Sequence, residues 1–135
     1  MDRTVRRLYL AGPMAGHADH NFALFNRVAR LLRDQGYQVF NPAENKDGGV
    51  RRSRAFYMRR DLPALMESDE VVVLPGWEQS RGASLEVWMA IDLDLPVYQY
   101  SEVGETVELE RVEGLQPGAL PFLGDAVDFP PPTVH

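Results

Sequence analysis

The sequence contains no cysteine. This excludes a disulfide framework, a thiol nucleophile and a zinc site built on thiolates, and it makes the reducing cytoplasm the expected compartment. The chain also lacks any apolar run close to the roughly 18 residues that a membrane span requires, and its first residues, Met1–Arg3, do not begin a signal peptide. We therefore expect a cytoplasmic protein without a membrane partner.

An excess of basic charge is lacking as well. The 135 residues include 14 Lys+Arg and 20 Asp+Glu, which gives a net charge of -6. Met1–Tyr100 contains 13 basic and 13 acidic residues, so the excess lies entirely in Ser101–His135, where seven acidic residues face Arg111 alone. Sequence-independent binding of a nucleic-acid polymer needs a basic surface, and none is expected here.

Five of the ten prolines also lie in Ser101–His135. We therefore predict one folded domain over residues 1–100 and an acidic, proline-rich C-terminal extension over residues 101–135. Within the extension, Ser101–Leu123 either wraps onto a neighbouring subunit or covers a pocket, and Gly124–His135 is expected to be mobile.

Strand and helix patterns alternate along the predicted domain. Short connections between them favour a parallel sheet covered by helices on both faces, which is a single-domain α/β fold of the Rossmann or flavodoxin-like type. Pro63 is expected to kink the second helix or to divide it into two short helices. The predicted strands are Arg7–Ala11, Tyr37–Phe40, Glu70–Leu74 and Pro96–Tyr100, and the predicted helices are Phe22–Gln35, Ser53–Ser68 and Ala83–Leu95.

In a sheet of this kind, ligands bind beyond the carboxyl ends of the strands, where the strand order reverses. Three segments are expected to converge there: Gly12–His20, Asn41–Asn45 and Pro75–Ser84. Ser80 and Ser84, together with the amide groups at the start of the last helix, either form a site for a phosphate or carboxylate or merely cap the helix.

Glu86 is expected in the first turn of that helix. A glutamate there either complements the helix dipole or, if the helix packs on the sheet, faces a pocket. Asp61 is a candidate partner carboxylate, although its position after Arg59 and Arg60 also fits a solvated ion pair. Two carboxylates in one pocket would suit the cleavage of a glycosidic bond.

Other chemistries have weaker support. The glycines from Gly12 to Gly16 lack the G-x-G-x-x-G spacing, so we expect no dinucleotide cofactor. His17 and His20 would need a third ligand to hold a metal, and no candidate stands out. Neither a Ser-His-Asp arrangement nor a Walker motif is present. We predict that the protein uses no cofactor and no metal.

The chain resembles the nucleoside 2-deoxyribosyltransferase-like superfamily over most of Arg7–Tyr100. This group includes the 2'-deoxynucleoside 5'-phosphate N-hydrolases and an uncharacterised bacterial and phage branch, DUF4406, in which the Pro75–Trp77 loop is typical. Asp61 and Asp69 are eight residues apart, and Ser80 precedes Glu86 by six. The resemblance rests on Tyr9–Met14, Asn41–Glu44, Asp61, Asp69, Ser80, Gly82 and Glu86.

The resemblance implies a catalytic role for three residues. Glu86 would be the nucleophile that attacks the anomeric carbon, Asp61 would assist at the base, and Tyr9 would position Glu86 or the sugar. Asp69 would be a structural cap at the start of its strand. The resemblance also implies a homodimer or higher homo-oligomer, because related enzymes complete the site with a residue of a neighbouring subunit.

Ser80 replaces an acid that contacts the sugar 5'-hydroxyl in the relatives that act on free nucleosides. A serine beside helix-start amides accommodates a phosphate that a carboxylate would repel, so it favours a nucleoside 5'-monophosphate. Trp77 either stacks on the base or fills the core. The predicted substrate-binding residues are Gly12, Pro13, Met14, Asn41, Trp77, Ser80, Gly82 and Ser84.

The leading hypothesis is therefore an N-glycosidase or glycosyltransferase that cleaves the base–sugar bond of (deoxy)nucleoside 5'-monophosphates. A non-catalytic nucleotide-binding or sensor module is the alternative from another class. An NAD-type glycohydrolase is a third possibility, since that chemistry also uses a glutamate near an anomeric carbon.

Overall fold

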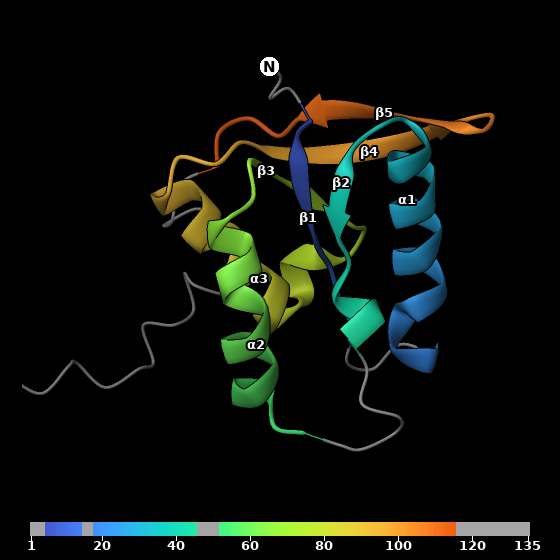
Figure 1. Cartoon of the computed structure of the whole chain (residues 1–135). Coiled ribbons are helices and arrows are strands. Elements are labelled where there is room, and N and C mark those ends of the chain that lie inside the picture. The colour runs from blue at the N-terminus through green and yellow to red at the C-terminus, as the bar shows by residue number, and fades with distance from the viewer. Residues whose placement is uncertain (1–4, 15–17, 46–51, 116–135) are drawn as a thin grey trace, which may run out of the picture.

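A computed structural model describes residues 5–14, 18–45 and 52–115 of the chain (Figure 1). Strands and helices alternate in it up to the fourth strand. The strands are β1 (Arg7–Ala11), β2 (Gln38–Phe40), β3 (Glu70–Val73), β4 (Val97–Val103) and β5 (Thr106–Arg111). The α-helices are α1 (Phe22–Asp34), α2 (Arg54–Met66) and α3 (Arg81–Asp92), and the 3₁₀ turns are η1 (Ala18–Asn21), η2 (Pro42–Asn45) and η3 (Trp77–Gln79).

The described strands form one sheet with the order β2-β1-β3-β4-β5. β1 pairs in parallel with β2 and β3, and β3 pairs in parallel with β4, whereas β5 is antiparallel to β4. The strand order reverses between β1 and β3, so the crevice that such folds use for ligands is expected beyond the carboxyl ends of these two strands. The predicted α/β fold is confirmed.

The two faces of the sheet carry separate cores. Leu8 and Leu10 of β1 pack with the buried face of α1, which includes Phe25 and Leu32. Tyr9 and Ala11 point to the other face and pack with residues of α2 and α3. These two helices lie on the side of the sheet opposite α1 (Figure 1). Because side chains alternate along a strand, β1 must be apolar on both faces, which explains its continuous apolar run.

The fifth strand was not predicted. β4 continues past Tyr100 to Val103, and β5 turns back along it. The sheet therefore extends into the segment that we expected to be an extension of the domain, and Val107 of β5 is buried with the α1 core. Charged residues alternate with apolar ones on β5, so its acidic composition concealed a half-buried edge strand.

The outer edge of β5 is tied to α1 by a side chain. Gln35, at the C-terminus of α1, accepts a hydrogen bond from the Val107 amide at 2.5 Å and donates one to the Val107 carbonyl at 3.0 Å. An edge strand presents unpaired backbone groups, and this amide side chain satisfies two of them.

α2 is one continuous helix, so of the two alternatives at Pro63, a kink or a division into two helices, the division is wrong. Leu65 is fully buried after the proline, and the Pro63 carbonyl accepts a hydrogen bond from the Glu67 amide. Tertiary packing of the last turn thus stabilises the helix by more than the missing hydrogen bond at the proline destabilises it. Within the described part of the chain, no helix combines the length and the apolar character that crossing a membrane would take.

Two truncations test the role of β5. A chain that ends at Tyr100 loses β5 and the last three of the seven residues of β4, which exposes the core beneath Val107. Burial of one valine alone contributes about 1.5–3 kcal/mol. We expect this chain to aggregate or to unfold at a much lower temperature. A chain that ends at Leu123 should melt like the full chain in differential scanning fluorimetry. Equal melting temperatures for both truncations would contradict the assignment of β5 to the core.

Candidate functional site

Several of the predicted site residues lie at one edge of the sheet. β1, β2 and β3 end at this edge, and α2 and α3 begin there (the lower edge in Figure 1). Three elements contribute to the site. They are β1, the second half of α2, and the first two turns of α3.

A hydrogen bond joins β1 to α3 at the centre of this region. The Tyr9 hydroxyl donates to Glu86 Oε2 at 2.6 Å, and both side chains are buried. Burial raises the pKa of Tyr9 well above its usual value, and the nearby Glu86 carboxylate raises it further. The phenol therefore remains protonated and remains a donor to Glu86.

The position of Glu86 in its helix differs from the prediction. α3 begins at Arg81 with Ser80 as its N-cap, so Glu86 is the sixth residue and lies in the second turn. The helix dipole acts mainly within the first turn, so its interaction with a glutamate in the second turn is weak. Glu86 is 8% exposed, so it is a buried residue of the helix face that packs on the sheet.

Asp61 lies close to this pair. It is 6% exposed on α2, and its charge, like that of Arg60, acts on the Tyr9 hydroxyl. Arg60 Nε donates to Asp61 Oδ1 at 3.0 Å. Burial raises the pKa of the Asp61 carboxyl, and the contact with Arg60 partly opposes that rise. The structure thus brings together the three residues predicted to be catalytic.

This arrangement has a definite chemical capacity. Glu86 is a carboxylate oriented at one oxygen by a buried phenol, which is suitable for a nucleophile. Asp61 is a carboxyl whose pKa is raised by burial, which makes it more suitable for proton transfer than a solvated aspartate. Carboxyl groups in unequal environments can divide the roles of nucleophile and acid between them.

The start of α3 offers groups for an anion. Ser80 caps the helix, since its Oγ accepts a hydrogen bond from the Ala83 amide at 3.2 Å. That bond uses an oxygen lone pair and leaves the hydroxyl proton to be donated elsewhere. A Cβ at Gly82 would meet only ordinary contact, with Met58 Sδ at 3.9 Å. Packing in the protein does not require this glycine, which leaves space beside the helix start.

Other predicted substrate-binding residues have structural roles at this edge. A Cβ at Gly12 would lie 2.7 Å from Leu74 Cβ, so the close approach of the ends of β1 and β3 requires a glycine. Pro13 accepts a hydrogen bond from Asn21 Nδ2 at 3.0 Å through its carbonyl. Met14 packs against the α1 core. These three residues thus shape the edge through a close backbone approach, a backbone hydrogen bond and side-chain packing, respectively.

Asn41, Ser84 and Trp77 are likewise buried in internal contacts. Asn41 donates to Asn26 Oδ1 and accepts from the Ala43 amide. The Ser84 hydroxyl, fully buried, donates to the backbone carbonyls of Trp77 and Glu78, and so ties η3 to α3. The indole of Trp77 is 7% exposed within the α3 core, which favours the core-filling alternative for it over base stacking.

Asp69 precedes β3, the strand that the resemblance expects it to cap, but its side chain contacts β1. It accepts a hydrogen bond from the Arg7 amide at the start of β1. His20 is exposed at the end of η1, and His17 lies outside the described residues. In residues 5–14, 18–45 and 52–115, no group of three or more His, Asp or Glu side chains is placed to hold a metal.

Sequence reasoning missed the role of Phe40. Its ring stacks on the Tyr9 ring at 5.2 Å with an interplanar angle of 13°. Phe40 is paired with Tyr9 in the register of β1 and β2, so the side chains share a face. The pairing of the two strands is the signal that would have found it, and the sequence alone does not supply that register.

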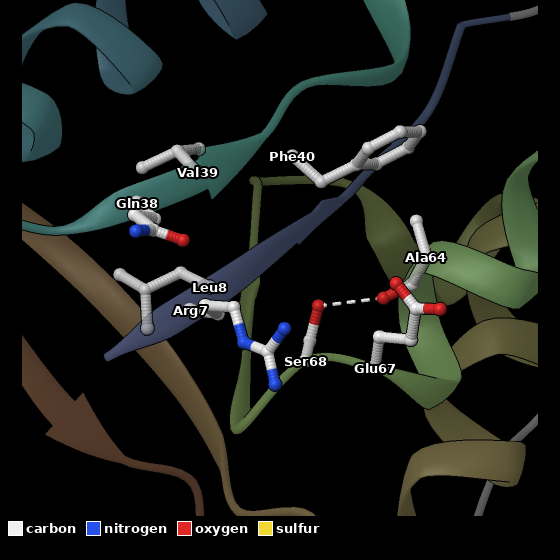
Figure 2. A pocket seen from close by; sticks show the side chains of 8 residues that line it. All are labelled: Arg7, Leu8, Gln38, Val39, Phe40, Ala64, Glu67 and Ser68. Carbon is white, nitrogen blue, oxygen red and sulfur yellow. Dashed lines mark hydrogen bonds between the residues drawn. The ribbon is translucent and has the colours of Figure 1, made fainter. Parts of the chain in front are cut away.

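A shallow hollow lies beside Phe40 but is distinct from the site (Figure 2). None of the candidate catalytic residues lines it. Arg7, Gln38 and Ser68 border it near the amino ends of β1 and β2, and the Ser68 hydroxyl bonds to the Ala64 carbonyl at 2.8 Å.

Replacement of Tyr9 by phenylalanine tests the buried hydrogen bond. The variant retains the ring and its stacking on Phe40 but deprives the buried Glu86 of a donor, which should lower the free energy of unfolding by about 1.5–3 kcal/mol. Chemical denaturation measures this change, with Tyr37→Phe, at a partly buried tyrosine outside the site, as the control. Equal losses in the two variants would show that the Tyr9–Glu86 bond contributes nothing specific.

Comparison with solved structures finds the same fold. A structure of a conserved protein from Enterococcus faecalis V583 is 24% identical with a TM-score of 0.53, over 71% of this chain and 63% of that chain. The chain thus spans less than two thirds of that protein, and likeness at this identity shows the fold. A structure of a 2-deoxyribosyltransferase from the psychrotolerant bacterium Bacillus psychrosaccharolyticus is 25% identical with a TM-score of 0.57, over 76% and 77% of the two chains.

A search of curated proteins finds no match. Residues 6–99, by contrast, match the model of a family described as a domain of unknown function, DUF4406. This match covers well over half of the chain and includes every residue of the candidate site. The chain therefore belongs to the DUF4406 family, and its fold is that of the nucleoside deoxyribosyltransferase-like superfamily.

Proposed function

We propose that this protein is an N-glycosidase or glycosyltransferase that cleaves the base–sugar bond of (deoxy)nucleoside 5'-monophosphates. The observation that carries the proposal is the buried hydrogen bond from Tyr9 to Glu86 beside a second buried carboxyl, Asp61. The structural likeness to a 2-deoxyribosyltransferase supports a glycosyl-transfer reaction.

Glu86 acts as the nucleophile in this mechanism. Its carboxylate attacks the anomeric carbon while the bond from that carbon to the base nitrogen breaks, which gives a glycosyl ester. Tyr9 holds one carboxylate oxygen through its hydrogen bond and is itself fully buried, so it positions Glu86 and does not touch the sugar.

Asp61 transfers the proton. Its protonated carboxyl protonates the departing base nitrogen, which takes the electron pair of the broken bond. The Asp61 carboxylate then removes a proton from water, and the hydroxide attacks the anomeric carbon and releases the Glu86 carboxylate. A second base in place of water would make the reaction a transfer.

The 5'-phosphate is assigned to the start of α3. The Ser80 hydroxyl and the amide groups of the first turn favour an anion, and Gly82 leaves room for it. No acid occupies the capping position, where a carboxylate would repel a phosphate.

Substitution of Glu86 tests the nucleophile. Glu86→Gln retains the size of the side chain but removes the attacking charge, so release of free base from a panel of deoxynucleoside and nucleoside monophosphates should fall by about a thousandfold or more. Asp92→Asn, an exposed acid on the same helix, is the matched control and should keep the parent rate.

Equal rates for Glu86→Gln and the parent would show that Glu86 is not the nucleophile. If the parent releases no base while a nucleotide raises its melting temperature, the protein is instead a non-catalytic nucleotide-binding module. Release of nicotinamide from NAD alone would identify it as an NAD-type glycohydrolase.

Substitution of Ser80 tests the phosphate. Ser80→Asp retains the helix cap, because aspartate caps as well as serine, but it places a negative charge against the 5'-phosphate. We expect the KM for monophosphates to rise at least about tenfold while the KM for free nucleosides does not rise. Ser80→Asn caps without charge and is the matched control. A parallel loss on both substrate classes would contradict the phosphate assignment.

A further inference from the structure

Arg60 contacts both the Asp61 carboxyl and a pair of aromatic rings on α2. Its Nε donates to Asp61 Oδ1 at 3.0 Å, with the arginine side chain 25% exposed and the aspartate side chain 9% exposed. Neighbouring residues on a helix point in different directions, so an arginine must bend back to reach the next side chain.

Two aromatic rings hold the guanidinium in that bent position. Arg60 Cζ lies 5.0 Å from the Tyr57 ring centroid and 5.9 Å from the Phe56 ring centroid. These residues precede Arg60 by three and four positions, which places them on its side of the helix. The two rings also contact each other edge to face, with centroids 5.5 Å apart. A flat guanidinium can stack on a ring and donate from Nε at the same time, whereas lysine cannot.

The surroundings of Asp61 come from three elements. Arg60 faces it from α2, Tyr9 from β1, and Glu86 is bonded to Tyr9 from α3. Two buried carboxyl groups therefore share one region with one phenol and one guanidinium. An opposite charge in direct contact stabilises the ionised form of a carboxyl, and a buried phenol gives no such charge.

We propose that Arg60 is a positioning residue, whose guanidinium, held by Tyr57 and Phe56, orients the Asp61 carboxyl and allows it to lose its proton in the reaction. This inference rests on the proposed function for the role of Asp61, but the contact between Arg60 and Asp61 does not. Without the Arg60 guanidinium, Asp61 would hold its proton more tightly and would donate it less readily to the departing base.

The direction of the pH effect follows from the charges. Burial raises the pKa of Asp61, and the Arg60 hydrogen bond and charge lower it again. Removal of Arg60 should therefore raise the Asp61 pKa further. If Asp61 is the proton donor, the loss of activity at high pH reports its ionisation, so this alkaline limb should move to higher pH.

Arg59 provides a matched control. It is the adjacent arginine on the same helix and is exposed, so Arg59→Gln removes the same charge one residue away. Arg60→Gln removes the charge and the contacts with both rings, and Arg60→Lys retains the charge but loses the Nε hydrogen bond. Tyr57→Leu removes the ring that supports the guanidinium while Arg60 remains.

The first measurement follows the titration of the Asp61 carboxyl through its ¹³C chemical shift. The signal is assigned to Asp61 by its absence from the spectrum of Asp61→Asn. We expect the pKa of Asp61 to rise by about one pH unit in Arg60→Gln, by less in Arg60→Lys and Tyr57→Leu, and not at all in Arg59→Gln. The second measurement is the pH dependence of kcat/KM for base release, where the alkaline limb should move in the same order.

The two measurements separate the two claims. If the parent releases base but Asp61 titrates alike in Arg60→Gln, Arg59→Gln and the parent, the positioning role of Arg60 is overturned and the proposed function stands. If the Asp61 titration moves as expected but the parent releases no base, the Arg60–Asp61 contact is supported and the function fails. Should Arg60→Gln not fold, Arg60→Lys carries the same comparison, and an unchanged titration in it overturns the inference.

Discussion

The hydrogen bond from Tyr9 to Glu86 is the interaction on which the site depends, because it holds a carboxylate inside the protein. Removing a carboxylate from water is costly unless donors replace the water, and here a buried phenol is one such donor. The bond links β1 to α3 across 77 residues of sequence, so it forms only after the sheet and its covering helix have assembled. The stacked ring of Phe40 on β2 then fixes the plane of the Tyr9 ring.

The remaining residues of this edge make that geometry possible by packing the chain closely. Gly12 lets the end of β1 approach Leu74, and the buried hydroxyl of Ser84 ties η3 to α3. Asn41 secures the turn after β2 through its own side-chain bonds to Asn26 and Ala43. These residues support the site through packing and hydrogen bonds, since catalytic side chains are held only as firmly as the backbone that carries them.

Much of the fold could be predicted because its signals are local. The apolar runs of β1 and β3 and the amphipathic pattern of α1 identify a parallel α/β sheet, and the structure confirms it. β5 was not predicted because an edge strand with one solvent-exposed face carries charged residues. α2 remained continuous because Leu65 is buried after the proline. Both are cases in which tertiary packing outweighs local preference.

By itself, the sequence determined the order of the three helices and the first four strands, the absence of a cysteine chemistry, and the identity of the residues from which a site can be made. The tertiary structure alone decided which of them meet: it brought Tyr9, Glu86 and Asp61 together, added Arg60 to them, and directed Asn41, Ser84 and Trp77 into the interior. The physical reason is that burial and hydrogen-bond partners depend on contacts between segments far apart in the chain. The residue type determines which chemistry a side chain is capable of. Its surroundings determine whether it is protonated, contacts another residue or binds a ligand.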